Sequence, residues 1–245
     1  MANDKPPTNI IVVLPTYNEA DNLPIIVPQL LDVAPLQVLV VDDDSPDGTG
    51  QVAESLKQQY RPRVDILHRR NAPRGLGLAY RAGFNAALAQ GAQVVIGIDA
   101  DLSHSPAYIP AMLEMMHSQA CDIVVGSRYV RGGGVEGNWG WPRKFLSWGA
   151  QQWARTILGI KTHDATGAFR CYSRRVLQML DFDRMHLDGF GFLIEIIYQA
   201  ERKSLKIVEF PIVFRDREQG DSKVTPRIIL DALTCVVNVR LRGGI

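Results

Sequence analysis

Short, mostly apolar runs of four or five residues recur through the first half of this sequence, at residues 10–14, 37–41, 64–67, 94–98 and 122–125. A run of this length is typical of a strand that is buried on both faces of a sheet. The intervening segments are long enough for helices, which we expect near residues 20–31, 51–60, 76–89 and 106–118. This alternation predicts an α/β fold in which a mostly parallel, Rossmann-like sheet is flanked by helices. Farther along, we expect strands at 166–172 and 207–214 and a helix at 190–202.

Composition limits the classes of function. At 245 residues, with 46% hydrophobic and 22% charged residues, the chain has the length and make-up of one large α/β domain or one domain with a small appendage. Its 27 basic and 26 acidic residues give a net charge of +1, so no overall positive field favours nucleic acid as a partner.

The sequence also carries signals of cellular compartment. Cys121, Cys171 and Cys235 are widely spaced and odd in number, which indicates free thiols in a reducing compartment. The first nine residues are polar and lack the apolar core of a signal peptide. No apolar run approaches the roughly 20 residues that span a bilayer, and the nearest, residues 228–241, is interrupted by polar side chains. We therefore expect a soluble or peripheral cytoplasmic protein.

Two carboxylates follow the fourth apolar run, in the stretch VVIGIDADLSHSP. Asp99 and Asp101 share a face of an extended segment and leave the sheet at its carboxyl edge, where ligands bind in open α/β folds. Two carboxylates this close repel each other unless a cation lies between them, and a hard ion such as Mg²⁺ or Mn²⁺ prefers oxygen ligands. The alternative is a strand that ends in two solvated aspartates, with Ser103 or Ser105 capping the next helix.

Two other motifs are weaker. The loop after the first run, residues 15–19 (PTYNE), is not glycine-rich, so a nicotinamide-binding Rossmann domain is disfavoured. Residues 43–54 resemble a calcium-binding loop, but a strand precedes them and Pro46 interrupts them. We expect Asp47 to cap the following helix instead.

Seven motifs in order carry a resemblance to a known family: PTYNEADNLP, VVDDDSPDGTG, RGLGLAYRAGF, DADLSHSP, GSRYV, TGAFRCYSR and GDSK. Together they resemble the family-two, inverting nucleotide-sugar glycosyltransferases of GT-A fold, and within them the dolichol- or polyprenyl-phosphate mannosyltransferases. The similarity runs from about residue 9 to residue 240. It implies one GT-A domain over residues 1–245, with a nucleotide-binding half at 9–126 and an acceptor-binding half at 127–245.

The resemblance implies roles for individual residues on the donor side. The residues that would bind the sugar nucleotide are Pro15, Tyr17, Glu19, Val41, Asp43, Asp99, Ala100, Asp101, Arg217 and Lys223. Within this set, Arg217 and Lys223 would belong to a mobile flap that closes over the diphosphate and excludes water. The metal, Mg²⁺ or Mn²⁺, would be held by Asp99 and Asp101. Relatives have a Gln at the position of Ser103, so Ser103 would be a third ligand or would leave its place to water.

On the acceptor side, the resemblance assigns Arg128 and Arg143 to the lipid phosphate, where they would act with Asp101 as the catalytic residues. Arginine matches phosphate oxygens well, whereas the alternative is a pair of solvated surface arginines. All four tryptophans fall between residues 139 and 153, among basic residues. Such a segment suits contact with a membrane surface, although Trp148 and Trp153 are equally compatible with core packing.

The implied reaction transfers mannose from GDP-mannose to a polyprenyl (dolichyl) phosphate with inversion, at the cytoplasmic face of a membrane. One alternative is a polyprenyl-phosphate glycosyltransferase that uses UDP-glucose or another sugar nucleotide. Another, from a different class, is a non-catalytic nucleotide-sugar-binding subunit of a membrane complex. A membrane-anchoring protein is a further candidate partner, and no nucleic acid is expected.

Overall fold

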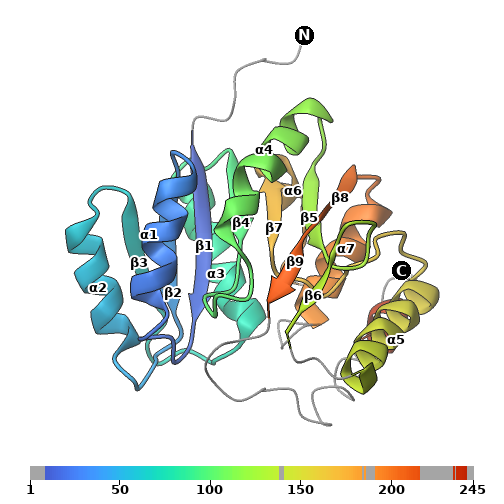
Figure 1. Ribbon diagram of the computed structural model, residues 1–245, viewed down its shortest axis with the longest axis horizontal. Coiled ribbons are helices and arrows are strands. Elements are labelled where there is room, and N and C mark those ends of the chain that lie inside the picture. The colour runs from blue at the N-terminus through green and yellow to red at the C-terminus, as the bar shows by residue number, and fades with distance from the viewer. Residues whose placement is uncertain are drawn as a thin grey trace.

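The computed structural model describes residues 9–137, 141–183, 185, 191–215, 234 and 236–241, and for residues 141–147 it describes the backbone. Seven strands form one sheet in the order β3-β2-β1-β4-β7-β5-β8 (Figure 1). These strands are β1 (Ile10–Thr16), β2 (Gln37–Asp42), β3 (Val64–His68), β4 (Val94–Gly97), β5 (Ile123–Ser127), β7 (Arg170–Ser173) and β8 (Ile207–Pro211). The predicted mostly parallel α/β fold is confirmed.

One strand departs from the parallel arrangement. β7 lies between β4 and β5 and is antiparallel to both. Its direction places the loop that precedes it, rather than the loop that follows it, at the edge of the sheet where β4 and β5 end. The sequence predicted a strand at 166–172; the strand begins only at Arg170, and residues 164–169 belong to that loop.

The last predicted strand, 207–214, is wrong as a single element. β8 ends at Pro211, and β9 (Val213–Arg215) pairs in parallel with β6 (Gly134–Glu136) in a separate two-stranded sheet. Ile212 separates the two, and its N–H donates to Ser127 O at 3.0 Å. The chain therefore leaves the main sheet where β5 also ends.

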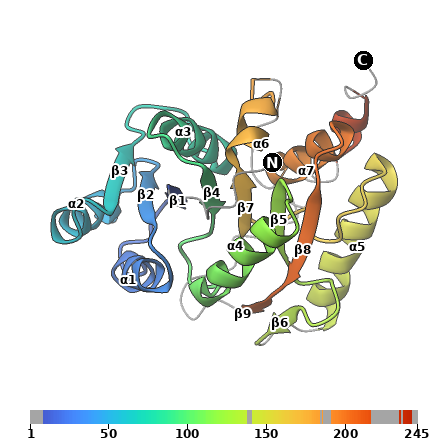
Figure 2. The same cartoon turned by 90° about the horizontal axis from the view of Figure 1, so that it is seen from above.

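The helices cover both faces of the sheet, as Figure 2 shows from above. They are α1 (Leu23–Val33), α2 (Thr49–Gln59), α3 (Leu76–Ala89), the 3₁₀ helix η1 (Pro106–Tyr108), α4 (Ile109–Ser118), α5 (Trp141–Leu158), α6 (Arg174–Met179) and α7 (Gly191–Arg202). Residues 236–241 are also helical. At the start of α2, Asp47 accepts from the N–H of Thr49 at 3.0 Å, as expected of a capping residue, although Gly48 occupies the N-cap position itself.

The continuous apolar runs supply two cores because alternate residues of a strand face opposite sides. Ile11 and Val13 of β1 join the core beneath α3, α6 and α7. Val12 and Leu14 join the core beneath α1, α2 and α4. All four side chains are fully buried, which explains why the runs show no alternation with polar residues.

Helix α3 approaches the sheet closely at Gly83. A β-carbon there would lie 2.4 Å from Val13 Cγ1 and 3.0 Å from Val41 Cγ2. A side chain of any size would push the helix off β1 and β2. This contact accounts for the last of the three glycines in the motif RGLGLAYRAGF.

Cys121 and Cys171 are buried free thiols, as predicted, whereas Cys235 lies outside the described residues. No helix in the described part of the chain is long and apolar enough to span a membrane.

Candidate active site

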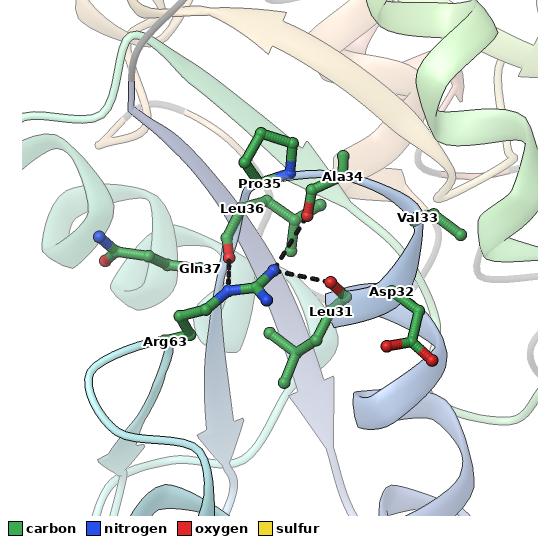
Figure 3. A pocket seen from close by; sticks show the side chains of 8 residues that line it. All are labelled: Leu31, Asp32, Val33, Ala34, Pro35, Leu36, Gln37 and Arg63. Atoms are coloured by element: carbon green, nitrogen blue, oxygen red, sulfur yellow. Dashed lines mark hydrogen bonds between the residues drawn. The ribbon is translucent and has the colours of Figure 1, made fainter.

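The carboxyl ends of β1, β2, β4 and β5 lie at one edge of the sheet because these strands are mutually parallel. The strand order reverses between β1 and β4, which is the place where ligands bind in open α/β sheets. A hollow at the opposite edge is lined by residues 31–37 and Arg63 (Figure 3). There the Arg63 guanidinium donates to the carbonyls of Leu31, Ala34 and Leu36 at 2.7–3.1 Å, so it caps the end of α1.

Asp99 and Asp101 follow β4 at this carboxyl edge. The Asp99 side chain is 28% exposed, and Asp101 is 8% exposed. The hydroxyl and the N–H of Ser103 both donate to Asp101 Oδ1, at 2.5 Å and 3.1 Å. These bonds fix the direction of the Asp101 carboxylate. Ser103 is itself buried, and its predicted role as a metal ligand stays a prediction.

The donor set at this position fits a hard divalent cation, because one short loop after β4 carries two carboxylates separated by a single residue. No group of three or more His, Cys, Asp or Glu side chains that could hold a metal ion occurs in the described part of the chain. An ion here would therefore need further oxygen ligands, of the kind that a diphosphate or water supplies. The predicted pair fits a metal that is shared with a bound nucleotide.

His104 is a buried residue of the same loop as the two aspartates. Its Nε2 is 3.8 Å from Asp99 Oδ2, and its ring packs edge-on against Phe214 at 5.1 Å between centroids. Burial and the nearby charge of Arg128 lower the pKa of His104 to about 4, so the ring is neutral at neutral pH. Phe214 belongs to β9, and the Arg128 guanidinium also lies over its ring, at 5.4 Å. His104 and Phe214 therefore join the aspartate loop to β9 and Arg128.

The predicted nucleotide side lies at the ends of β1 and β2. Asp43 is buried; its Oδ1 accepts from Arg69 Nη1 and its Oδ2 accepts from the N–H of Gly75 at 2.8 Å. Arg74 lies 4.9 Å above the Tyr17 ring and donates to its hydroxyl at 3.0 Å. Sequence reasoning assigned neither Arg69 nor Arg74. The signal that could have found them is the basic loop between the third strand and the third helix.

The other predicted donor residues lie either near the ends of strands or in the loops that follow them. Pro15 and Val41 are register partners in β1 and β2. The Val41 side chain is buried in the core, so it leaves the backbone as the part that could contact a nucleotide. Glu19 lies in the loop after β1, where its Oε2 accepts from Asn22 Nδ2 at 2.7 Å. Ala100 is buried between the two aspartates.

Arg128 directly follows β5, and its guanidinium forms a two-point ion pair with Asp164. Nε donates to Oδ2 and Nη2 donates to Oδ1, both at 2.8 Å, while the Arg128 N–H donates to Oδ2 at 3.1 Å. Burial alone would raise the pKa of Asp164, but the charge and the hydrogen bonds of Arg128 outweigh it and hold that pKa below its usual value. Sequence reasoning missed Asp164, since it precedes β7 at a distance of 36 residues from its partner.

The loop that carries Asp164 is itself held by two carboxylates from neighbouring elements. Glu201 of α7 accepts from the N–H groups of Lys161 and Thr162 at 2.8–3.0 Å. Glu209 of β8 accepts from the N–H of Asp164 at 3.0 Å. The ion pair with Asp164 therefore joins Arg128 to a loop that is hydrogen-bonded to the main sheet.

The remaining predicted residues cannot be placed. Arg217, Lys223 and Trp139 lie outside the described residues, and Arg143 and Trp141 lie in the part of α5 for which the backbone alone is described. Trp148 and Trp153, farther along α5, are 48% and 41% exposed. The core-packing alternative for these two tryptophans is thereby disfavoured.

Comparison with known proteins gives concordant matches. The family model "Glycosyl transferase family 2" matches residues 11–180. Polyprenol monophosphomannose synthase of Mycolicibacterium smegmatis is 40% identical over 99% of this chain and 91% of its own length. Undecaprenyl-phosphate mannosyltransferase of Micrococcus luteus is 40% identical over 96% of this chain and 93% of its own.

Among solved structures, glucosyl-3-phosphoglycerate synthase of Mycobacterium tuberculosis with Mn²⁺, UDP and phosphoglyceric acid superposes with a TM-score of 0.70. The superposition covers 95% of this chain and 78% of that one at 16% identity, so it speaks for the fold alone. The predicted GT-A fold and the predicted family are both confirmed. This chain is a glycosyltransferase and belongs to glycosyl transferase family 2.

Proposed function

We propose that this enzyme transfers mannose from GDP-mannose to a polyprenyl phosphate, with inversion at the anomeric carbon. The observation that carries the proposal is the 40% identity, over nearly the whole chain, to two proteins named for polyprenyl-phosphate mannose synthesis. The site geometry agrees with it. Asp99 and Asp101, whose carboxylates suit a metal ion bound to a diphosphate, follow β4, and Arg128, whose guanidinium suits a phosphate, follows β5.

The donor would bind at the ends of β1, β2 and β4, in the half formed by residues 9–126. Tyr17 and Asp43 would contact the nucleoside, and Asp99 and Asp101 would hold Mg²⁺ or Mn²⁺ against the diphosphate. When bound, the metal supplies positive charge that stabilises the departing diphosphate. The two hydrogen bonds that Ser103 donates would keep the Asp101 carboxylate in a fixed direction.

The acceptor would bind in the half formed by residues 127–245. There Arg128, with Arg143, would direct a phosphate oxygen of the acceptor at the anomeric carbon. The new bond joins that oxygen to the carbon, the bond from the carbon to the donor diphosphate breaks, and its electron pair leaves with the nucleoside diphosphate. The attacking oxygen is already anionic near neutral pH, since the second pKa of a phosphate monoester is about 6. No general base is required.

A lipid acceptor requires that the protein reach a membrane surface, because exposing each CH₂ group of the lipid to water costs about 0.8 kcal/mol. We propose that α5 makes this contact peripherally, at the cytoplasmic face. Its exposed Trp148 and Trp153 accompany Arg155 on the same helix. Aromatic rings with basic neighbours suit the headgroup region.

The decisive experiment is a matrix of radiolabelled sugar nucleotides against short polyprenyl phosphates, with the purified chain and added Mg²⁺ or Mn²⁺. We expect label transfer from GDP-mannose to exceed transfer from UDP-glucose by at least about tenfold, a difference of about 1.4 kcal/mol. Preference for UDP-glucose would replace the donor assignment. Donor binding without transfer to any acceptor would favour a non-catalytic subunit.

A further inference from the structure

Thr166 lies in the loop before β7, beside Arg128 and against α5. Its Oγ1 is 3.1 Å from Arg128 Nη2 and also contacts Gln151 Nε2. Gln151 extends from α5 and is 2% exposed, whereas Thr166 keeps part of its surface exposed. The hydroxyl thus lies between a buried amide and the arginine that we assign to the acceptor.

The direction of each hydrogen bond at this hydroxyl follows from chemistry. The N–H of Ala165 can only donate, and it bonds to Gln151 Oε1 at 3.1 Å, so the amide must present its NH₂ group to Thr166. The Arg128 guanidinium is also only a donor. A hydroxyl has two acceptor lone pairs and one proton, and here both lone pairs are engaged. The proton is not needed for either of these two bonds, so the hydroxyl can donate it to a third group on the exposed side of Thr166.

The surroundings indicate what that third group is. The Thr166 proton and the neighbouring guanidinium both donate, so together they suit an oxyanion. Asp164 already occupies the Nε–Nη2 side of the Arg128 fork, which leaves fewer N–H groups for a bidentate contact with phosphate. A second donor beside Arg128 would compensate for this loss.

We propose that Thr166 Oγ1 donates a hydrogen bond to a phosphoryl oxygen of the acceptor, and that Gln151 orients it. This inference rests on the proposed function, in which Arg128 faces the acceptor phosphate. The donor diphosphate offers the same chemistry. We assign the contact to the acceptor because Thr166 Oγ1 is hydrogen-bonded to Arg128, the residue that the proposed function places on the acceptor phosphate. Gln151 is a positioning residue, since it acts through Thr166.

The test uses Thr166→Val, which removes the hydroxyl and keeps the branched shape. Kinetics with a short, water-soluble polyprenyl phosphate should show the KM for the acceptor raised about 10- to 100-fold, as expected for one lost hydrogen bond to a charged group. The kcat should change little, because the bond is present in both ground and transition states. Thr166→Ser should recover most of the lost affinity. Thr156→Val, an exposed position on α5, is the matched control and should leave KM unchanged.

A second variant keeps the hydroxyl in place. Gln151→Glu offers only acceptors when ionised, so the Thr166 proton would turn toward the carboxylate and the acceptor KM should again rise. The inference is overturned if the acceptor KM of Thr166→Val stays within about twofold of wild type. If Thr166→Val does not fold, the same criterion applies to Gln151→Glu. An equal loss of GDP-mannose affinity by calorimetry also overturns it, because it would move the contact to the donor. Wild-type protein that transfers nothing in the same assay refutes the proposed function, and this inference with it.

Discussion

Replacing Asp164 by asparagine tests whether the Arg128 ion pair is a structural support of the site. Asp164 accepts four hydrogen bonds, three from Arg128 and one from the N–H of Gly167 at 3.0 Å. The side chains of Arg128 and Asp164 are 9% and 0% exposed. In Asp164→Asn the amide NH₂ would face a guanidinium donor, and the buried cation would lose its counter-charge. Breaking a buried pair in this way costs about 3–5 kcal/mol, so we expect the free energy of unfolding to fall by that amount.

Urea unfolding at pH 7, followed by tryptophan fluorescence, measures this loss. The matched control is Asp65→Asn, which breaks the exposed Lys57–Asp65 pair (2.8 Å; side chains 31% and 47% exposed) and should cost less than about 1 kcal/mol. Equal losses in the two variants would refute the reasoning. The acid dependence gives a second check. Because the folded-state pKa of Asp164 is lowered, its stabilisation is complete above the unfolded pKa of about 3.9 and is lost as the pH falls through the folded pKa. Asp164→Asn should lack this acid-dependent component.

Three further predictions concern the metal, the membrane and the core. Asp101→Asn should abolish transfer while circular dichroism and melting stay near wild type; full wild-type activity in excess chelator would contradict the metal assignment. Changing Trp148 and Trp153 together to Ser should weaken liposome co-sedimentation and slow transfer to vesicle-embedded acceptor, yet spare transfer to a short soluble one; equal losses on both substrates would exclude membrane contact as their role. Gly83→Ala should lower the free energy of unfolding by about 1–3 kcal/mol through overpacking. The control Gly149→Ala, with no atom within 4 Å of the added carbon, should raise it by about 0.5–1 kcal/mol. A loss of stability in Gly149→Ala as large as that in Gly83→Ala would refute the packing argument.

Much of the fold could be predicted from sequence because both faces of the sheet are covered. A strand such as residues 10–14 is then apolar at every position, and it stands out against the amphipathic helix that follows it. The antiparallel direction of β7 could not be predicted in this way. A buried strand has the same apolar pattern in either direction, and its neighbours in the sheet come from distant parts of the chain.

The residues of the candidate site likewise differ in whether they could be predicted from the sequence. Asp99 and Asp101 could be predicted because one short segment contains both the strand and the carboxylates. Asp164 and Thr166 could not, since neither has chemical meaning until β7 is inserted beside β5 and brings the loop to Arg128. Pairs separated by 36 and 38 residues leave no local pattern.

The position of β5 in the sheet has a consequence for biosynthesis. Its two neighbours, β7 and β8, are both translated after it, and β4 reaches it only through β7. While the ribosome adds residues 128–169, β5 has two unpaired edges, and β4 has a partner on one side alone. Such edges recruit other chains into aggregates. The segment up to residue 127 therefore cannot complete its sheet as a nascent domain, because β5 can pair only after residues 170–211 have left the exit tunnel. Nascent chains that stall between these points are the ones that most need a chaperone.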